Sequence, residues 1–189
     1  MFLRTLCTAL LAPCLLAAVP SLAQTGNQMG NMPMQGSSDK PMPSPPATAT
    51  ITLAGQTLMI KYNSPSMRGR EIFGGLVPYD QVWRTGANPA TTLITPVSLH
   101  IGNLLVPAGT YTIYTLPSRK KWMLIVNQQT GQWGTEYKQE QDLGRVELKE
   151  KTIPQQELMS LSFDEIKHDS AELHIRWATT DESVKITTP

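Results

Sequence analysis

Apolar and polar residues alternate along most of the chain after Thr48, which is the pattern of strands with one buried face. The first pair of predicted strands spans 51–53 and 58–62, with Ala54 and Gly55 between them as a hairpin turn. The segment 122–126 is apolar on both faces, which is typical of a central strand. The other predicted strands are 97–101, 111–116, 146–148, 159–163, 171–177 and 183–186.

These segments amount to about eight or nine short strands separated by glycine and proline turns. No segment between them carries a long helical stripe, which excludes an α/β fold, and only single helical turns at 78–84 and 154–158 are expected. We therefore predict an all-β fold, an antiparallel β-sandwich, with a closed β-barrel as the alternative. The predicted inward-facing residues are Leu58, Ile60, Leu99, Ile101, Leu124, Val126, Leu161, Phe163, Leu173 and Ile175.

The first 23 residues have the features of a secretory signal peptide. Arg4 supplies the positive start, 6–19 is mostly Leu and Ala, and 21–23 ends in the small residues that signal peptidase reads. We therefore expect export to the periplasm or beyond, with no transmembrane segment after the signal is removed. Both cysteines of the chain lie in this segment, so the exported chain would lack a catalytic cysteine and a thiolate metal cage.

Residues 24–47 are rich in proline and glycine and contain no Leu, Ile, Val or aromatic residue. Such a composition predicts a disordered linker between the signal and a single domain over 48–189. Met29, Met32 and Met34 lie in this linker, and thioether sulfur is a soft ligand that suits Cu(I). The alternative is a low-complexity tether in which the methionines are incidental.

The net charge of the chain argues against a nucleic-acid-binding protein. The 16 Lys and Arg residues nearly balance the 15 Asp and Glu residues, which gives a formal net charge of +1. A nucleic-acid binder needs a clustered basic excess, so this class is excluded.

One segment, 63–92, does not have the pattern of a strand. Its apolar and aromatic residues predict an ordered loop packed on one end or face of the sandwich, and ordered loops of this length are usually functional. Arginine offers a planar fork of donors for a carboxylate or sugar oxygens, and Trp and Tyr offer flat apolar faces. The candidate ligand-binding residues are Arg68, Arg70, Tyr79, Trp83, Arg84 and Asn88.

The same loop also has a structural interpretation. Arg84 could bind carbonyl groups of its own loop, Asn88 could cap a turn, and Trp83 could belong to the core. Other chemistry has weaker signals: Glu71 and Asp80 are the only carboxylates of the loop available to a hydrolase. His100 and His174 could bind a metal with Glu172, but unrelated exposed histidines are the ordinary alternative. The sequence contains no His-Glu-x-x-His motif, no Gly-x-Ser-x-Gly motif and no glycine loop of the kind that binds phosphate.

Several runs of the sequence are distinctive as a set: SPSMRGREIFGGLVPY at 64–79, VWRTGAN at 82–88, VPAGTYTIYTLP at 106–117, WMLIVN at 122–127 and QWG at 132–134. Together they resemble the bacterial secreted family catalogued as domain of unknown function 2911. The resemblance implies export and a β-rich fold, and it implies no reaction. Pro89 stands where the family commonly has an acidic residue, so any chemical role of that carboxylate is lost or moved here.

We therefore expect an exported, non-catalytic binding module for a glycan or small ligand, without a cofactor. A copper-handling protein that uses the linker methionines is one alternative. A hydrolase with its site in the 63–92 loop is the other.

Overall fold

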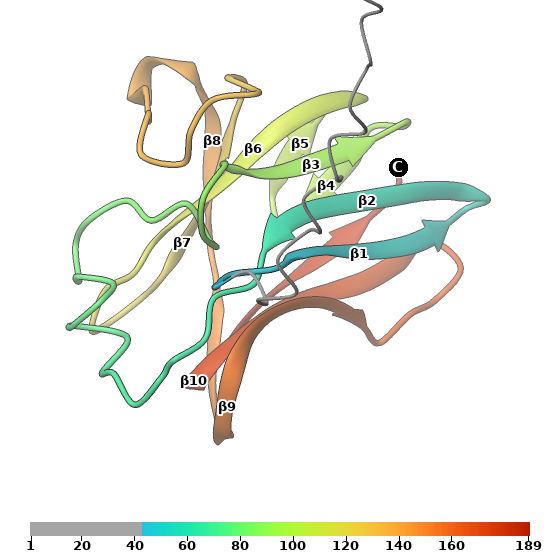
Figure 1. Cartoon of the computed structure of the whole chain (residues 1–189). Helices are drawn as coiled ribbons and strands as arrows, with labels where there is room; N and C mark the ends of the chain where they lie inside the picture. Colours follow the sequence, from blue (N-terminus) through green and yellow to red (C-terminus); the bar gives the residue numbers. More distant parts are fainter. Residues whose placement is uncertain (1–42) are drawn as a thin grey trace, which may run out of the picture. The chain divides into compact units, whose positions relative to one another are not determined.

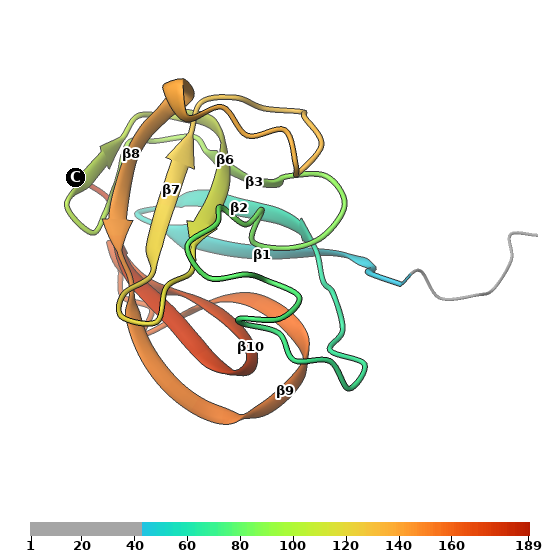
Figure 2. The same cartoon turned by 90° about the vertical axis from the view of Figure 1, so that its left-hand side faces the viewer.

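The computed structural model describes residues 43–189, which form an all-β domain with two antiparallel sheets and one 3-10 turn, η1 (Gln139–Gln141) (Figures 1 and 2). The larger sheet has the order β1 (Pro46–Leu53), β2 (Gln56–Asn63), β3 (Thr91–Thr95), β6 (Gly109–Leu116), β7 (Met123–Asn127), β8 (Asp142–Glu147). The smaller sheet has the order β5 (Leu104–Val106), β4 (Leu99–Ile101), β10 (Ser170–Thr187), β9 (Lys149–Asp164).

The predicted antiparallel β-sandwich is thus confirmed, and the described strands close no barrel. The two sheets share one apolar core, because the alternating residues of β2, β4, β7, β9 and β10 all point into it. Each of the ten predicted inward-facing residues is buried there, with exposed fractions between 0% and 9%. No helix among residues 43–189 is long and apolar enough to cross a membrane.

Several elements differ from those expected from the sequence. The strand β3 was not predicted from the sequence, and its first two residues fall in the segment that was predicted to be a loop. Two of its buried positions are threonines, Thr91 and Thr95, so the strand lacks the alternation of apolar and polar residues. The expected helical turn at 154–158 lies inside β9, and 78–84 forms no helix. Pro154 is compatible with a strand there because β9 is at the edge of its sheet. The expected separate strand at 183–186 is not separate, because these residues form the last part of β10.

The structure describes the predicted domain and only the end of the predicted linker. The predicted signal peptide 1–23 and most of the predicted linker lie outside the described residues. The first strand begins at Pro46, two residues before the predicted start of the domain at Thr48.

The long strand β10 folds back on itself. The Nδ1 atom of His174 lies 2.8 Å from Oδ1 of Asp181, although seven residues of straight strand would span about 23 Å. The bend is at Ala178, which has a φ of 54° and lies between two register shifts against β9. Arg176 closes the fold, since its Nε donates to Asp181 at 3.0 Å.

The loop 64–90 connects β2 to β3 and lies at one end of the sandwich, as the green trace in Figure 1 shows. It is attached to both sheets. Ser66 forms a bridge with Leu158 of β9, and Trp83 forms one with Thr115 of β6. The loop is therefore ordered by backbone pairing, in agreement with its prediction from the sequence.

Candidate functional site

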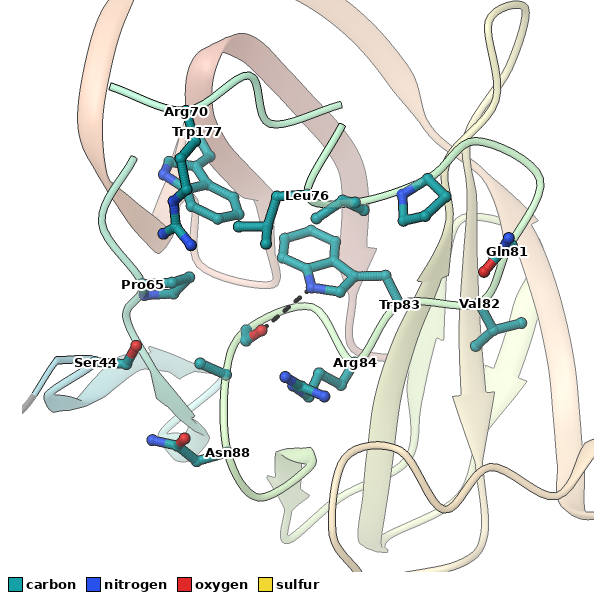
Figure 3. Close-up of a pocket in the computed structure, with 14 residues that line it drawn as sticks. Ser44, Pro65, Arg70, Leu76, Gln81, Val82, Trp83, Arg84, Asn88 and Trp177 are labelled. Carbon is teal, nitrogen blue, oxygen red and sulfur yellow. Dashed lines mark hydrogen bonds between the residues drawn. The ribbon is translucent and has the colours of Figure 1, made fainter. Parts of the chain in front are cut away.

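The 64–90 loop builds a pocket of about 350 Å³. The loop supplies most of the lining, and Trp177 of β10 and Ser44, just before β1, complete it (Figure 3). The polar side chains of the lining are Ser44, Arg70, Gln81, Arg84 and Asn88. The apolar side chains are Pro65, Leu76, Val77, Pro78, Val82, Trp83, Ala87 and Trp177.

Two stacked indoles form the apolar wall. The rings of Trp83 and Trp177 lie 5.8 Å apart between centroids with an angle of 19° between their planes. Phe73 meets both edge-on, at 6.1 and 6.2 Å, and also meets Trp122 at 4.7 Å. The indole nitrogen of Trp83 donates to the carbonyl of Gly86 at 3.2 Å (Figure 3). Because that donor is used, this indole offers the pocket an apolar surface.

Arg84 is the most unusual side chain of the pocket. Its Nε is buried and has no hydrogen-bond partner among residues 43–189. Partial burial lowers the pKa of its guanidinium, because a cation removed from water loses hydration. The structural interpretation, in which Arg84 binds carbonyls of its own loop, thus has no hydrogen bond to support it within the described chain.

The backbone that follows the pocket arginine adopts positive φ angles. Thr85 has a φ of 52° and Asn88 a φ of 60°, both in the left-handed region. A β-branched residue rarely adopts this conformation, and such strain persists only where the surroundings fix it. Here the Thr85 hydroxyl donates to Thr115 Oγ1 at 3.2 Å, and the Thr85 carbonyl accepts from Thr91 Oγ1 at 2.9 Å. The fold thereby holds the position of Arg84 at a cost in backbone strain.

Arg70 is the second arginine of the pocket, and the loop holds it in place. Its Nε donates to the carbonyl of Met67 at 2.9 Å, and one terminal nitrogen donates to that of Ser66 at 2.7 Å. In Figure 3 the guanidinium groups of Arg70 and Arg84 lie around the same space, with Asn88 beside it. No acidic residue lines this pocket, so its net charge is positive.

The structure brings together four of the six predicted ligand-binding residues, Arg70, Trp83, Arg84 and Asn88. The remaining two, Arg68 and Tyr79, do not line this pocket. Arg68 donates to the carbonyl of Pro43 at 3.0 Å, and the Tyr79 ring lies beneath Arg119 at 4.8 Å.

Two lining residues, Ser44 and Trp177, come from outside the loop that was predicted to form the site. Ser44 falls in the predicted linker, and Trp177 has only the signal of a core residue on a strand. Their part in the pocket depends on contacts between distant segments, for which one sequence carries no local signal.

The other candidate chemistries do not meet at this pocket. Glu71 and Asp80, the carboxylates of the loop, are absent from its lining. His174 pairs with Asp181, and no group of three metal-binding side chains occurs within 43–189. The predicted copper ligands Met29, Met32 and Met34 lie outside the described residues.

Gly134 fixes the side chain of Arg84 from outside the loop. A Cβ at this position would overlap Arg84 Cδ and would lie 2.9 Å from both Arg84 Cβ and the Asn88 carbonyl oxygen. We expect Gly134→Ala to cost about 1–3 kcal/mol in the free energy of unfolding by overpacking, measured by chemical denaturation. In an Arg84→Ala background the cost should be smaller, because the closest clash is gone. Thr135→Ala, at the exposed neighbouring position, is the control, and an equal effect there would contradict this packing.

The fold and the pocket define an all-β sandwich in which a long loop at one end encloses a small cationic pocket. The family model described as "Protein of unknown function (DUF2911)" matches residues 44–186, so the chain belongs to this family. The match confirms the resemblance found in the sequence and covers every strand from β1 to β9 and nearly all of β10. No curated protein and no solved structure matches the chain significantly.

Proposed function

We propose that this protein is an exported, non-catalytic module that binds a small ligand in the pocket around Arg84. The observation that supports this most is the half-buried guanidinium of Arg84, which has no acidic side chain beside it in the pocket lining. Burial of a cation without a counter-ion is costly, so a protein rarely retains one unless another group completes the site. A bound ligand would supply that group.

The surroundings of Arg84 support binding as well. The pocket combines an apolar wall with a few polar groups, which is the usual composition of a small-ligand site. The strained backbone of Thr85 indicates a geometry that the fold maintains at a cost, as at many ligand-binding sites.

The lining favours binding over catalysis. It contains no Asp, Glu, His, Cys, Lys or Tyr to act as acid or base, so its one hydroxyl, that of Ser44, has no base in the lining to activate it as a nucleophile. A guanidinium has only donors and no acceptor, so Arg70 and Arg84 can attract and orient a ligand but cannot serve as a general base.

Arg84→Ala tests the proposal on the purified chain. We expect its free energy of unfolding to change by about 1 kcal/mol or less, because no hydrogen bond of the described chain is lost. Small-molecule binding should be strongly weakened. The measurement is the shift of the indole N–H signals of Trp83 and Trp177 in NMR spectra, during titration with a panel of small carboxylates, phosphates and sugars.

Two controls sharpen this test. Trp133 does not line the pocket, so its indole signal serves as an internal reference. Arg119→Ala removes an arginine outside the pocket and should leave binding unchanged. A loss of several kcal/mol of stability in Arg84→Ala would favour the structural interpretation of the loop, and wild-type titrations without any shift would contradict the proposed site.

Export is the second part of the proposal, and it is supported by the signal-like sequence of residues 1–23. Expression of the full-length chain in a bacterial host, followed by mass spectrometry of the periplasmic fraction, tests it. A mature N-terminus at Gln24 is the expected result, and an intact Met1 in the cytoplasm would contradict it.

A further inference from the structure

We infer that the ligand is a small carboxylate with an apolar, ring-sized body, bound with its carboxylate on Arg84 and its body against the Trp83 and Leu76 side of the pocket. This inference rests on the proposed function and specifies the chemistry of the ligand. Three features of the described residues lead to it: the donors available at Arg84, the shortage of acceptors, and the exposed apolar rim.

The donors of the pocket fit a planar anion. The two terminal nitrogens of a guanidinium form a fork that matches the two oxygens of a carboxylate, and Figure 3 shows those of Arg84 at the pocket. A phosphate has a third charged oxygen and commonly uses lysine or a helix N-terminus as well. The lining contains no lysine, and residues 43–189 contain no α-helix to provide such a terminus. Arg70 adds a second positive charge, although two of its nitrogens already donate to carbonyls.

The pocket is poor in hydrogen-bond acceptors. A neutral sugar carries many hydroxyl donors, and these need acceptors when they leave water. Among the side chains of the lining, only the amides of Gln81 and Asn88 and the hydroxyl of Ser44 can accept. The lack of any carboxylate therefore favours an anion over a neutral glycan.

The apolar wall specifies the rest of the ligand. Leu76 belongs to the lining and is nevertheless 46% exposed, so an apolar side chain faces solvent at the rim. Trp83 presents carbon surface, since its nitrogen donates to Gly86. A ring between these two side chains would cover surface that water now covers, and the volume of about 350 Å³ limits the ligand to a few rings at most.

The experiment compares matched probes on the purified chain by calorimetry and by the Trp83 indole signal. Phenylacetate is the carboxylate, phenylacetamide its neutral isostere, and acetate, inorganic phosphate and glucose are the other probes. We expect phenylacetate to bind at least about tenfold more tightly than each of the others, as for a charge-assisted bidentate contact. Arg84→Gln should abolish the preference over phenylacetamide, and Arg84→Lys should not restore it.

A second variant tests the apolar body of the ligand. Leu76→Ser should weaken phenylacetate binding several-fold and leave acetate binding nearly unchanged. The matched control is Ile166→Ser, at a position 60% exposed and outside the pocket, which should alter neither.

The possible outcomes distinguish a failure of the carboxylate inference from a failure of the proposed binding site. In one outcome phenylacetamide or glucose shifts the Trp83 signal as strongly as phenylacetate does, and the Arg84→Gln variant shows the same shifts. The pocket would then bind ligands, but the inference that the ligand is a carboxylate would be wrong. Preferential binding of phosphate would also overturn the inference and retain the site. If no probe shifts either pocket indole, the inference and the proposed function fall together.

Discussion

Glu182→Gln is expected to remove most of the loss of stability that the wild-type protein shows as the pH rises from 5 to 8. Glu182 lies in β10 with 0% of its surface exposed. Neither of its carboxyl oxygens has a hydrogen-bond partner within the described part of the chain. Burial, with smaller contributions from the charges of Glu150 and Asp181, raises the pKa of this carboxyl from the ordinary 4.5 to about 8.

The direction of the pH effect follows from proton binding in the two states. Below pH 4.5 the folded and unfolded chains both hold the proton of Glu182. Between 4.5 and about 8 the unfolded chain releases it and the folded chain keeps it, so the free energy of unfolding falls as the pH rises. Each pH unit in this window costs about 1.4 kcal/mol, so the total is on the order of a few kcal/mol.

Glutamine has the same shape and no charge at any of these pH values, so the variant lacks this contribution. Near pH 5 it should resemble the wild type, and near pH 8 it should be more stable by a few kcal/mol. Urea denaturation at four pH values measures the difference. Glu150→Gln, at the exposed position opposite Glu182 in β9, is the control and should change the slope only slightly. Parallel pH curves for wild type and Glu182→Gln would show that this carboxyl is not protonated in the fold.

Trp177→Ala should destabilise the protein by about 3–5 kcal/mol and also abolish binding in the pocket. The indole is only 1% exposed, stacks on Trp83, and donates from its nitrogen to the carbonyl of Glu157 at 3.1 Å. Its removal leaves a large cavity in the core and takes away one wall of the pocket. Denaturation curves measure the first effect, and titration followed by the Trp83 indole signal measures the second.

A matched core variant separates these two effects. Leu173→Ala lies on the same strand and at an equally buried position, but it does not line the pocket. It should cost about 2–5 kcal/mol and leave the affinity of the folded protein unchanged. Lys185→Ala, exposed on the same strand, should change stability by about half a kcal/mol or less. If Leu173→Ala weakened binding as much as Trp177→Ala, the loss of binding in both variants would reflect general destabilisation and not the removal of a pocket wall.

The sandwich could be predicted from the sequence because its core follows the simplest pattern. The residues of β10 from Leu173 to Trp177 alternate strictly, and alternation alone places them inside. The β1–β2 hairpin was predicted for a similar reason, because two alternating segments are separated by Ala54 and Gly55. In the structure these two residues form the turn and have positive φ angles. The strand β3 was missed because its threonines satisfy their hydroxyls internally, for example Thr91 with the Thr85 carbonyl. Such a hydrogen bond depends on tertiary structure.

The candidate site could be predicted in part. Arg70, Trp83, Arg84 and Asn88 belong to one unusual loop, so their proximity in sequence was enough to group them. Local sequence could not show that Arg68 instead turns toward the carbonyl of Pro43. It also could not show the raised pKa of Glu182, because only the folded β9–β10 pair places this carboxyl in the core and opposite Glu150.

The way the chain enters the domain determines how the protein can be attached to anything else. Ser44 belongs to the pocket lining, whereas the C-terminus, marked in Figure 2, lies at the opposite end of the β-sheet domain from the start of β1. Any label, resin or fused partner joined directly ahead of residue 44 would thus stand at the mouth of the pocket and obstruct it. Attachment after Pro189 leaves the mouth facing solution, so an immobilised sensor of this protein should be built from its C-terminus.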